Sequence, residues 1–241
     1  MRGLLLHVLC LNWAIFGWAR QDDRDRRLLL SDPQMLQAQL EAMQRRIQAL
    51  ETQATVRETG SGAVYTIWGR RGCPLVNGTT TLYTGITGGK MYNMKGSGVT
   101  TMCLPHDPDS LPVSFHSPDD SHTAFIFGAE FEMNYKNIAD NDDVPCAVCH
   151  AQTSTSAVMI PAKLTCPQNW KLQYNGFMAA ERYDYFASDF ICVDLNPEYI
   201  EGTRAINADG RLIHPVKARC GSLPCPPYKD KQYVSCVVCT N

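Results

Sequence analysis

The 241-residue chain lacks the motifs of the common enzyme classes. It has no Gly-x-Ser-x-Gly elbow, no His-Glu-x-x-His metal pair and no glycine-rich phosphate loop. It also has no Gly-x-y tract, which excludes a collagen triple helix formed by this chain itself. The formal net charge is only −2, so nothing in the charge balance favours nucleic acid. We therefore expect a protein that is not an enzyme and that has no cofactor, no catalytic residues and no metal site.

Long apolar stretches are equally scarce. The main one covers residues 4–18, follows Arg2, and is shorter than the roughly 20 residues needed to span a bilayer. Small residues end this stretch at Ala19, which is the pattern of a signal peptidase site. Residues 1–19 are therefore predicted to be a signal peptide, and the protein is predicted to be secreted, extracellular and without a membrane span.

Residues 20–32 form a charged linker. Within it, Arg24-x-Arg26-Arg27 matches the pattern cut by proprotein convertases of the secretory pathway, and such a cut would leave Leu28 as the first residue. A solvated run of charges is the alternative, and we prefer it.

Residues 33–55 have the periodicity of a coiled-coil helix, because apolar residues recur at spacings of 4 and 3. Ser31-Asp32-Pro33 is a typical helix start. The apolar stripe is narrow, so a single helix packed on the domain would bury little, and self-association into a dimer or trimer is the better interpretation. Arg46 and Glu51 have the spacing of an interchain ion pair. The predicted seam consists of Leu36, Leu40, Met43, Ile47, Leu50 and Ala54.

Residues 56–62 end in Thr59-Gly60-Ser61-Gly62 and are predicted to be a flexible hinge. Beyond them, short runs of β-branched and aromatic residues alternate with Gly, Pro, Asn and Asp clusters, which predicts a mainly β fold. The expected strands are residues 63–68, 80–84, 99–104, 123–127, 130–135, 157–160, 170–174, 190–195, 211–216 and 233–238.

The cysteines reveal an internal repeat. Val144-Pro145-Cys146-Ala147-Val148-Cys149 recurs as Val234-Ser235-Cys236-Val237-Val238-Cys239. A Cys-Pro pair and a Tyr-x-Gly element precede each copy at matching distances. This self-similarity predicts a disulfide-rich domain of two tandem β repeats, residues 63–149 and 150–241. Each repeat alone would be small, so we expect the two to share a core.

An even number of cysteines in a secreted chain indicates a disulfide framework. Cys10 belongs to the signal peptide, and the other cysteines are Cys73, Cys103, Cys146, Cys149, Cys166, Cys192, Cys220, Cys225, Cys236 and Cys239. Symmetry pairs the first two with Cys146 and Cys149. It likewise pairs Cys166 and Cys192 with Cys236 and Cys239, and leaves Cys220 to bridge Cys225. An exchange of partners between the repeats would satisfy the same counts.

The Cys-x-x-Cys pairs have three other interpretations, all of which we consider weaker. Two pairs together form a tetrahedral zinc set, but an oxidising compartment competes for the thiols. A redox dithiol usually begins a helix, whereas these flanks are strand-like. Cys146 to His150 matches a haem attachment motif. The equivalent second pair, however, is followed by Thr240, so the histidine is not part of the repeat.

Two surface features complete the candidate sites. Asn77-Gly78-Thr79 is an N-glycosylation sequon in a polar turn, and we predict a glycan at Asn77, with a plain Asn-Gly turn as the alternative. The acidic loops at residues 140–143 and 106–109 lack the spacing of a known calcium loop. Solvated turns are the preferred interpretation of both.

Several motifs together resemble a known family. They are Val64-Tyr-Thr-Ile-Trp-Gly-Arg-Arg-Gly-Cys-Pro74, Met102-Cys-Leu-Pro105, Phe127-Gly-Ala-Glu-Phe-Glu132, the two cysteine pairs, Met159-Ile-Pro-Ala162, Phe190-Ile-Cys-Val-Asp194 and Cys220-Gly-Ser-Leu-Pro-Cys-Pro-Pro-Tyr228. From residue 63 onward the chain resembles the C-terminal cysteine-rich domain of invertebrate short-chain collagen-like (spongin-type) proteins. The resemblance implies a matrix-associated or secreted oligomer that carries this domain on a stalk. Relatives tend to have histidine where this chain has Tyr92-Asn93-Met94 and Tyr183-Asp184-Tyr185.

These observations predict a secreted, oligomeric protein of extracellular structure or interaction. It would display the disulfide-bonded β domain on a coiled-coil stalk, with an extracellular matrix protein or a glycan as the candidate partner. The alternative is a lectin-like or innate-immune recognition protein. For that role the candidate contact residues are Trp68, Tyr92, Trp170 and Tyr183.

Overall fold

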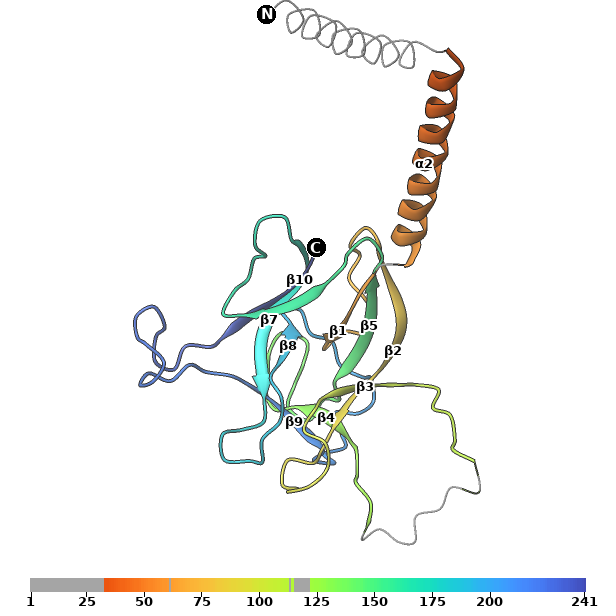
Figure 1. The fold of residues 1–241 in the computed structure, drawn as a ribbon. Coiled ribbons are helices and arrows are strands. Elements are labelled where there is room, and N and C mark those ends of the chain that lie inside the picture. Colours follow the sequence, from red (N-terminus) through yellow and green to blue (C-terminus); the bar gives the residue numbers. More distant parts are fainter. Residues whose placement is uncertain (1–32, 61, 113, 115–121) are drawn as a thin grey trace, which may run out of the picture. The chain divides into compact units, whose positions relative to one another are not determined.

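The computed structural model describes residues 33–60, 62–112, 114 and 122–241, and residues 53–60 as backbone only. The chain divides into two compact units, residues 1–60 and 61–241 (Figure 1). The predicted signal peptide and the charged linker with Arg27 lie outside the described residues. No helix in the described part of the chain is both long enough and apolar enough to cross a membrane.

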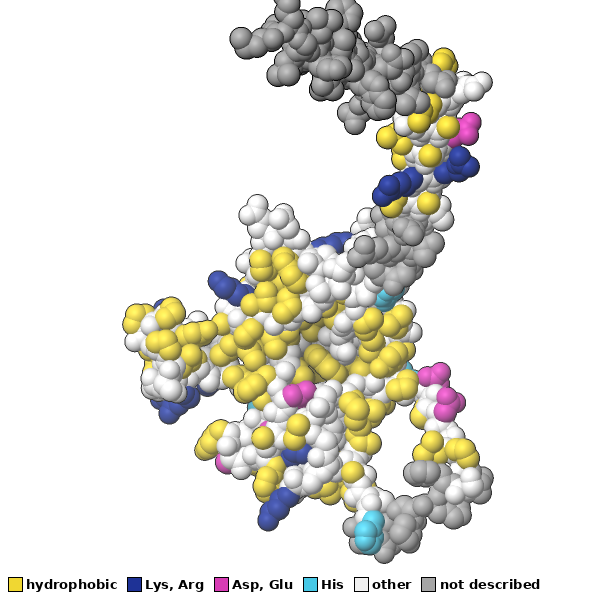
Figure 2. Space-filling view, in the orientation of Figure 1, with side chains coloured by type: hydrophobic (Ala, Val, Ile, Leu, Met, Phe, Trp, Pro, Cys, Tyr) yellow, Lys and Arg dark blue, Asp and Glu magenta, His cyan; other side chains and the backbone are white. Residues whose placement is uncertain are grey.

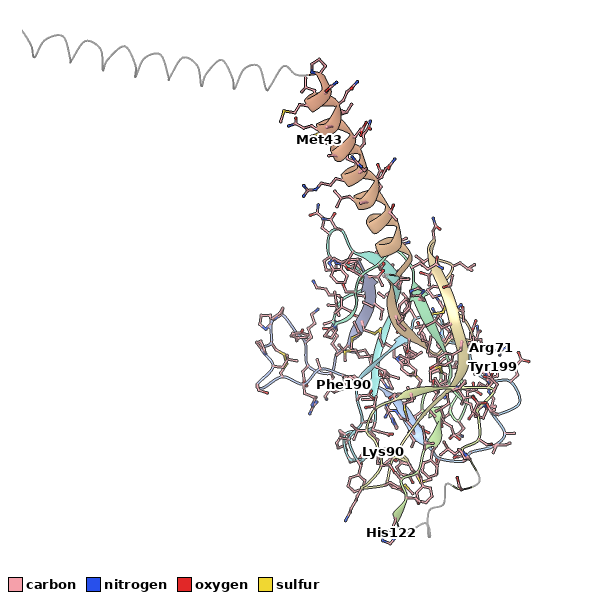
Figure 3. All side chains as sticks on the ribbon, turned by 45° about the vertical axis from the view of Figure 1, so that its right-hand side comes forward. Met43, Arg71, Lys90, His122, Phe190 and Tyr199 are labelled. Atoms are coloured by element: carbon pink, nitrogen blue, oxygen red, sulfur yellow. A yellow bond between two sulfur atoms is a disulfide. The ribbon has the colours of Figure 1, made fainter. Side chains whose placement is uncertain are left out.

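The first unit contains the helix α2 (Pro33–Gly60). The helix begins where the sequence predicts, but it continues past Thr55, so residues 56–60 are helical and do not belong to a hinge. Arg57 and Glu58 are compatible with a helix, and glycine is a common residue at a helix end, which accounts for the longer element. Side chains project from residues 33–52 of α2, Met43 among them (Figure 3).

The described residues of the second unit form ten strands in two equivalent sets of five. The first set is β1 (Ala63–Trp68), β2 (Thr79–Gly89), β3 (Met102–Pro105), β4 (Phe127–Phe131) and β5 (Pro145–Ala151). The second is β6 (Ala157–Pro161), β7 (Lys171–Ala180), β8 (Ile191–Asp194), β9 (Arg211–Pro215) and β10 (Ser235–Thr240). This confirms the predicted mainly β class.

The two sets have the same antiparallel pairings. β5 lies between β1 and β2, as β10 lies between β6 and β7. β3 and β4 pair with β2, as β8 and β9 pair with β7. The strand arrangement therefore repeats along with the cysteine spacing.

The observed strands differ from the expected ones in length and in number. β2 and β7 continue to Gly89 and Ala180, beyond the expected ends at residues 84 and 174. Residues 123–126 lie outside any strand, and β4 alone replaces the two strands expected at 123–127 and 130–135. β5 was not among the expected runs, although it carries Cys146 and Cys149. All of its residues except His150 are buried, so it lacks the alternation of polar and apolar residues by which a half-exposed strand is recognised.

Parallel pairings join the two repeats. Trp68 of β1 pairs with Val193 of β8, and residues 129–131 of β4 pair with residues 211–213 of β9. β9 also pairs with β7, so the pairings form a closed circuit through β7, β8, β1, β5, β2, β4 and β9. The two repeats thus contribute to one continuous sheet (Figure 1).

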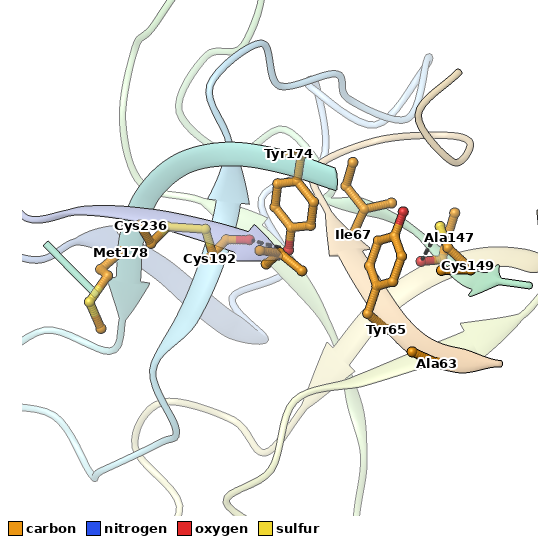
Figure 4. Packing of buried hydrophobic residues seen from close by; sticks show 11 residues of the cluster. Ala63, Tyr65, Ile67, Ala147, Cys149, Tyr174, Met178, Cys192 and Cys236 are labelled. Atoms are coloured by element: carbon orange, nitrogen blue, oxygen red, sulfur yellow. Dashed lines mark hydrogen bonds between the residues drawn. A yellow bond between two sulfur atoms is a disulfide. The ribbon is translucent and has the colours of Figure 1, made fainter. Parts of the chain in front are cut away.

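The repeats also share a hydrophobic core (Figure 4). Tyr65 of the first repeat and Tyr174 of the second are both buried, with ring centroids 6.3 Å apart. The Tyr65 hydroxyl donates to Gln173 at 2.8 Å, and the Tyr174 hydroxyl to the carbonyl oxygens of Thr66 and Cys192 at 3.0 Å. Burial raises the pKa of both phenols, so they remain neutral donors. The bonds from Tyr65 to Gln173 and from Tyr174 to Thr66 cross the repeat boundary and join the two halves.

Five disulfides join described cysteines, which confirms the prediction of a disulfide framework. They are Cys73–Cys149, Cys103–Cys146, Cys166–Cys239, Cys192–Cys236 and Cys220–Cys225. Equivalent bridges have nearly equal Cα–Cα distances, 5.8 and 5.8 Å for the first kind and 5.7 and 5.8 Å for the second. The two cysteines of each Cys-x-x-Cys pair bond different partners. Their sulfur atoms are therefore not free for zinc, for a dithiol within the pair, or for haem.

The equivalent glycines Gly85 and Gly176 lie where neighbouring strands approach closely. A Cβ at Gly176 would overlap the backbone carbonyl of Val193 in β8. We expect Gly176→Ala to lower the free energy of unfolding by about 1–3 kcal/mol, since β7 must move away from β8. Urea denaturation measures this effect. Gly128→Ala is the control, because a Cβ there meets nothing within 4 Å, and equal losses in both variants would contradict the explanation.

Candidate functional site

The loops that follow β2 and β7 meet at one end of the second unit. The amide of Phe186 donates to the carbonyl oxygen of Tyr92 at 3.1 Å. The rings of Tyr92 and Tyr185 lie 4.6 Å apart between centroids, and His214 of β9 approaches the Tyr185 ring at 6.0 Å. The structure thus brings together the two tyrosine segments at 92–94 and 183–185. Equivalent loops of the two repeats form a single surface, which we call the tyrosine surface.

Cationic side chains flank the tyrosine surface. The Arg182 guanidinium lies 4.1 Å from the centroid of the Tyr185 ring and pairs with Asp184 at 2.6 Å. Lys90 lies 5.5 Å from the centroid of the Phe186 ring (Figure 3). Tyr183 is 96% exposed. Lys90 is only 3% exposed, so the accessible groups are the Tyr183 ring and the Asp184-paired Arg182 guanidinium, which are suited to contact with a hydroxyl-rich ligand.

A buried ionic network lies beneath these loops. Arg211 is fully buried, and its Nη1 lies 3.5 Å from Oε1 of Glu181, which is itself only 2% exposed at its side chain. The same oxygen accepts from the Leu212 amide at 3.1 Å. Burial lowers the pKa of Arg211 and raises that of Glu181, while the attraction between the two charges opposes both shifts.

The network extends from Arg211 to the first repeat. Its Nη2 donates to the carbonyl oxygen of Asp189 at 3.3 Å and lies 3.5 Å from a carboxylate oxygen of that residue. The Asp189 carboxylate also accepts from the amide and the hydroxyl of Thr101. A buried arginine of the second repeat is therefore linked through one aspartate to a segment of the first.

Three carboxylates gather beside the β4–β9 pairing. Glu130 lies in β4, Glu132 directly follows that strand, and Asp209 comes just before β9, with ligand atoms within 4.8 Å of one another. Burial, which is the main cause, and the negative charges of Asp140, Asp209, Glu130 and Glu181 together raise the pKa of Glu132 to about 7. The sequence alone does not indicate this cluster, because Asp209 is distant from the glutamates along the chain.

The four aromatic residues predicted for recognition do not form one site. Trp68 packs against two hydrophobic clusters, so it belongs to the core. Trp170 directly precedes β7, whereas Tyr183 follows its other end, so the two lie at opposite ends of a ten-residue strand. Only Tyr92 and Tyr183 belong to the loops of the tyrosine surface.

The acidic loop at residues 140–143 has a structural role that the sequence did not suggest. Asp142 is fully buried and pairs with Arg204 through contacts of 2.7 and 2.6 Å. It also accepts from the Ala139 amide at 2.7 Å. Asp142 is therefore neither in a solvated turn nor available for calcium. Residues 106–109, by contrast, are exposed as expected.

The glycosylation sequon lies on the surface. Asn77 is exposed in the turn before β2, and Gly78 has a φ of 82°, a value that favours glycine. The Lys171 ammonium donates to the backbone carbonyl oxygen of Asn77, so this bond does not involve the Asn77 side chain to which a glycan would be attached. A glycan at Asn77 stays a prediction.

A cleft of about 450 Å³ is lined by Arg71, Asn137, Glu198 and Tyr199 (Figure 3). Its charged groups are engaged in intramolecular bonds. Arg71 donates from Nη2 to the carbonyl oxygen of Tyr199 at 2.7 Å, and its amide donates to Glu198 at 2.8 Å. These hydrogen bonds therefore hold the loop after β1 against the loop after β8, and the cleft is a structural contact.

The second unit also exposes apolar side chains (Figure 2). Val64 of β1, Val158 of β6 and Phe190 are exposed and line an open cleft of about 290 Å³. Grouped apolar side chains on a surface commonly mark contact sites for other molecules. No protein-family model matches the chain, so its function is inferred from these surfaces and motifs.

Proposed function

We propose that this protein is secreted and acts as an oligomer in extracellular structure or interaction. Helix α2 joins the chains, and each chain displays one disulfide-bonded β unit. Five disulfides support the secretory route, because such bonds persist in oxidising compartments and are rare in the cytosol. The motifs shared with spongin-type proteins support the same proposal, with a matrix protein or a glycan as the partner.

The observation that carries the proposal is the apolar stripe of α2. Leu36, Leu40, Met43, Ile47 and Leu50 are between 51 and 66% exposed, while the side chain of Ala54 lies outside the described residues. Burying one such side chain contributes about 1.5–3 kcal/mol, so a second copy of the helix gains from covering the stripe. The heptad spacing is the one that two or three parallel helices require.

An oligomeric stalk would serve weak binding by the β units. Linking several copies makes each later binding event intramolecular, which raises avidity without any new contact. The exposed apolar and tyrosine surfaces of the second unit are the candidates for such binding. This is why we assign interaction, and not chemistry, to the molecule.

Sedimentation of the secreted protein tests the stalk. We expect the natural chain to sediment as a dimer or trimer, and the variant Leu40→Glu with Ile47→Glu to sediment as a monomer, since two buried charges per helix oppose association. Ala42→Glu with Gln48→Glu adds the same charge outside the seam and should stay oligomeric. A monomeric natural chain, or an oligomeric seam variant, would overturn the role of α2.

Glycan recognition through the tyrosine surface is the second candidate function. The pairing of Tyr92 with Tyr185 and the exposure of Tyr183 favour it. On a glycan array, the natural chain should then bind a defined set of sugars, and Tyr183→Ala should lose that binding while Tyr233→Ala, another exposed tyrosine, keeps it. Equal binding by both variants would remove this candidate.

A further inference from the structure

We propose that Glu130, Glu132 and Asp209 bind one calcium ion at the junction between the two repeats. The site lies outside the acidic loops that the sequence singled out. Its role follows from its position: Glu130 and Glu132 belong to the first repeat, and Asp209 belongs to the second. The ion would therefore link the repeats to each other.

The strand geometry places the three carboxylates together. Glu130 pairs with Leu212 in the parallel β4–β9 ladder, and the Glu132 amide donates to the carbonyl oxygen of Ile213 at 3.2 Å. Residues two apart on an extended chain point to the same side, so both glutamates face one way. Asp209 lies two residues before β9. The donor atoms, all within 4.8 Å of one another, fit around one ion whose oxygen ligands lie about 2.3–2.6 Å away.

Glu130 supplies an independent sign of a ligand. It is only 3% exposed, and its Oε1 accepts from the Ala208 amide at 3.0 Å. Its other oxygen, Oε2, is buried and has no hydrogen-bond donor among the described residues. A buried carboxylate oxygen without a donor loses its hydration and gains nothing in return. A cation at the cluster provides the missing partner.

The charge around the cluster is uncompensated. Among ion pairs between described residues, none involves Glu130, Glu132 or Asp209. Arg211 is engaged by Glu181 and Asp189, and Arg204 by Asp142. Three like charges at this separation repel one another unless a positive charge lies between them.

The ligand chemistry selects calcium. Carboxylate oxygens are hard ligands, which suits calcium or magnesium better than zinc or copper, whose sites use histidine and cysteine. Glu132 and Asp209 are partly exposed, so water can complete the coordination sphere. Calcium accepts such irregular, partly hydrated sites more readily than magnesium does, and extracellular calcium modules work at Kd values of about 0.1–1 mM.

The disulfides give the ion a structural task. Every bridge joins two cysteines of the same repeat, so no described covalent cross-link connects the repeats. The β4–β9 pairing is one of the two parallel contacts between them. Calcium at this place would cross-link the two repeats, as the disulfides cross-link segments within each repeat.

Calorimetric titration of the full-length secreted protein with CaCl₂, after removal of calcium by EDTA and dialysis, tests the site. We expect one ion per chain with a Kd of about 0.1–1 mM, and a rise in Tm of about 3–8 °C at 10 mM calcium. Glu132→Gln and Asp209→Asn should each weaken binding at least about tenfold. Both variants should fold without calcium, because each removes a repelling charge.

The control is Asp107→Asn with Asp109→Asn, which neutralises an exposed acidic loop and should leave calcium affinity unchanged. The absence of calcium binding up to 10 mM in the natural chain would overturn the proposal. So would calcium binding that survives Glu132→Gln and Asp209→Asn, because the ion would then lie elsewhere. Loss of binding in the control alone would assign the ion to residues 106–109 and would also overturn it.

Discussion

Replacing Arg211 with methionine is expected to lower the free energy of unfolding by about 3–5 kcal/mol. Arg211 is fully buried, and methionine retains much of its apolar volume while removing the charge. The loss leaves the buried Glu181 carboxylate without its ion-pair partner. Removing one partner of a buried ion pair destabilises a protein more than replacing both partners with apolar residues. It also removes the link through Asp189 to Thr101 of the first repeat. Urea denaturation followed by fluorescence measures the change.

The control for this variant is Arg182→Met, because the Arg182–Asp184 pair is solvent-exposed and should matter far less. A double variant, Arg211→Met with Glu181→Gln, removes the stranded charge and should recover part of the loss. Equal destabilisation by Arg211→Met and Arg182→Met would show that the buried network does not hold the loops to the sheet. No recovery in the double variant would attribute the loss to packing.

The second large effect is expected from the disulfides within the sheet. Removing Cys192–Cys236 as a pair of alanines should cost about 4 kcal/mol, because the bridge closes a segment with a sequence separation of 44. Cys103–Cys146, with a separation of 43, should cost the same. Cys220–Cys225 has a separation of only 5 and should cost about 2 kcal/mol. Denaturation of the three double variants under non-reducing conditions gives the comparison.

The equality of the first two losses is the sharper part of this prediction. It follows from the repeat, since both bridges join a short strand to the first cysteine of the Cys-x-x-Cys pair. A loss at Cys220–Cys225 as large as the other two would contradict the loop-length argument. A large difference between Cys103–Cys146 and Cys192–Cys236 would contradict the structural equivalence of the repeats.

The disulfide framework was predictable because it rests on spacing alone. Four cysteines of each repeat recur at matching distances. The pairing of Cys73 and Cys103 with the first Cys-x-x-Cys pair was therefore supported by the equivalent pairing in the second repeat. The strands rich in β-branched residues, such as β1 and β6, were found for a similar reason. Both signals are local or periodic, and a single sequence displays them.

The features near the repeat junction were not predictable in this way. The parallel β4–β9 pairing joins segments far apart in the chain, and neither segment carries a mark of its partner. The cluster of Glu130, Glu132 and Asp209 depends on that pairing, as does the burial of Arg211. The tyrosine segments at 92–94 and 183–185 were noted separately, but their contact arises only from the closed circuit of strands.

Helix α2 shows a further limit of sequence patterns. The heptad spacing identified the helix and its stripe of exposed apolar side chains, whereas the glycine and serine at residues 59–62 suggested an earlier end. The hinge was predicted at residues 56–62 because glycine and serine are common in flexible segments, although residues 56–58 are compatible with a helix. The number of chains around the stripe depends on contacts between molecules, which a pattern of a and d residues does not specify.

Mapping the disulfides of the secreted protein by non-reducing mass spectrometry tests the central claim most directly, which is that two equivalent bridged β repeats form an extracellular unit. We predict five bridges, each within one repeat, and a chain that begins after Ala19 or, if cleaved further, at Leu28. Free thiols at Cys146, Cys149, Cys236 and Cys239, or a bridge between the repeats, would contradict this account.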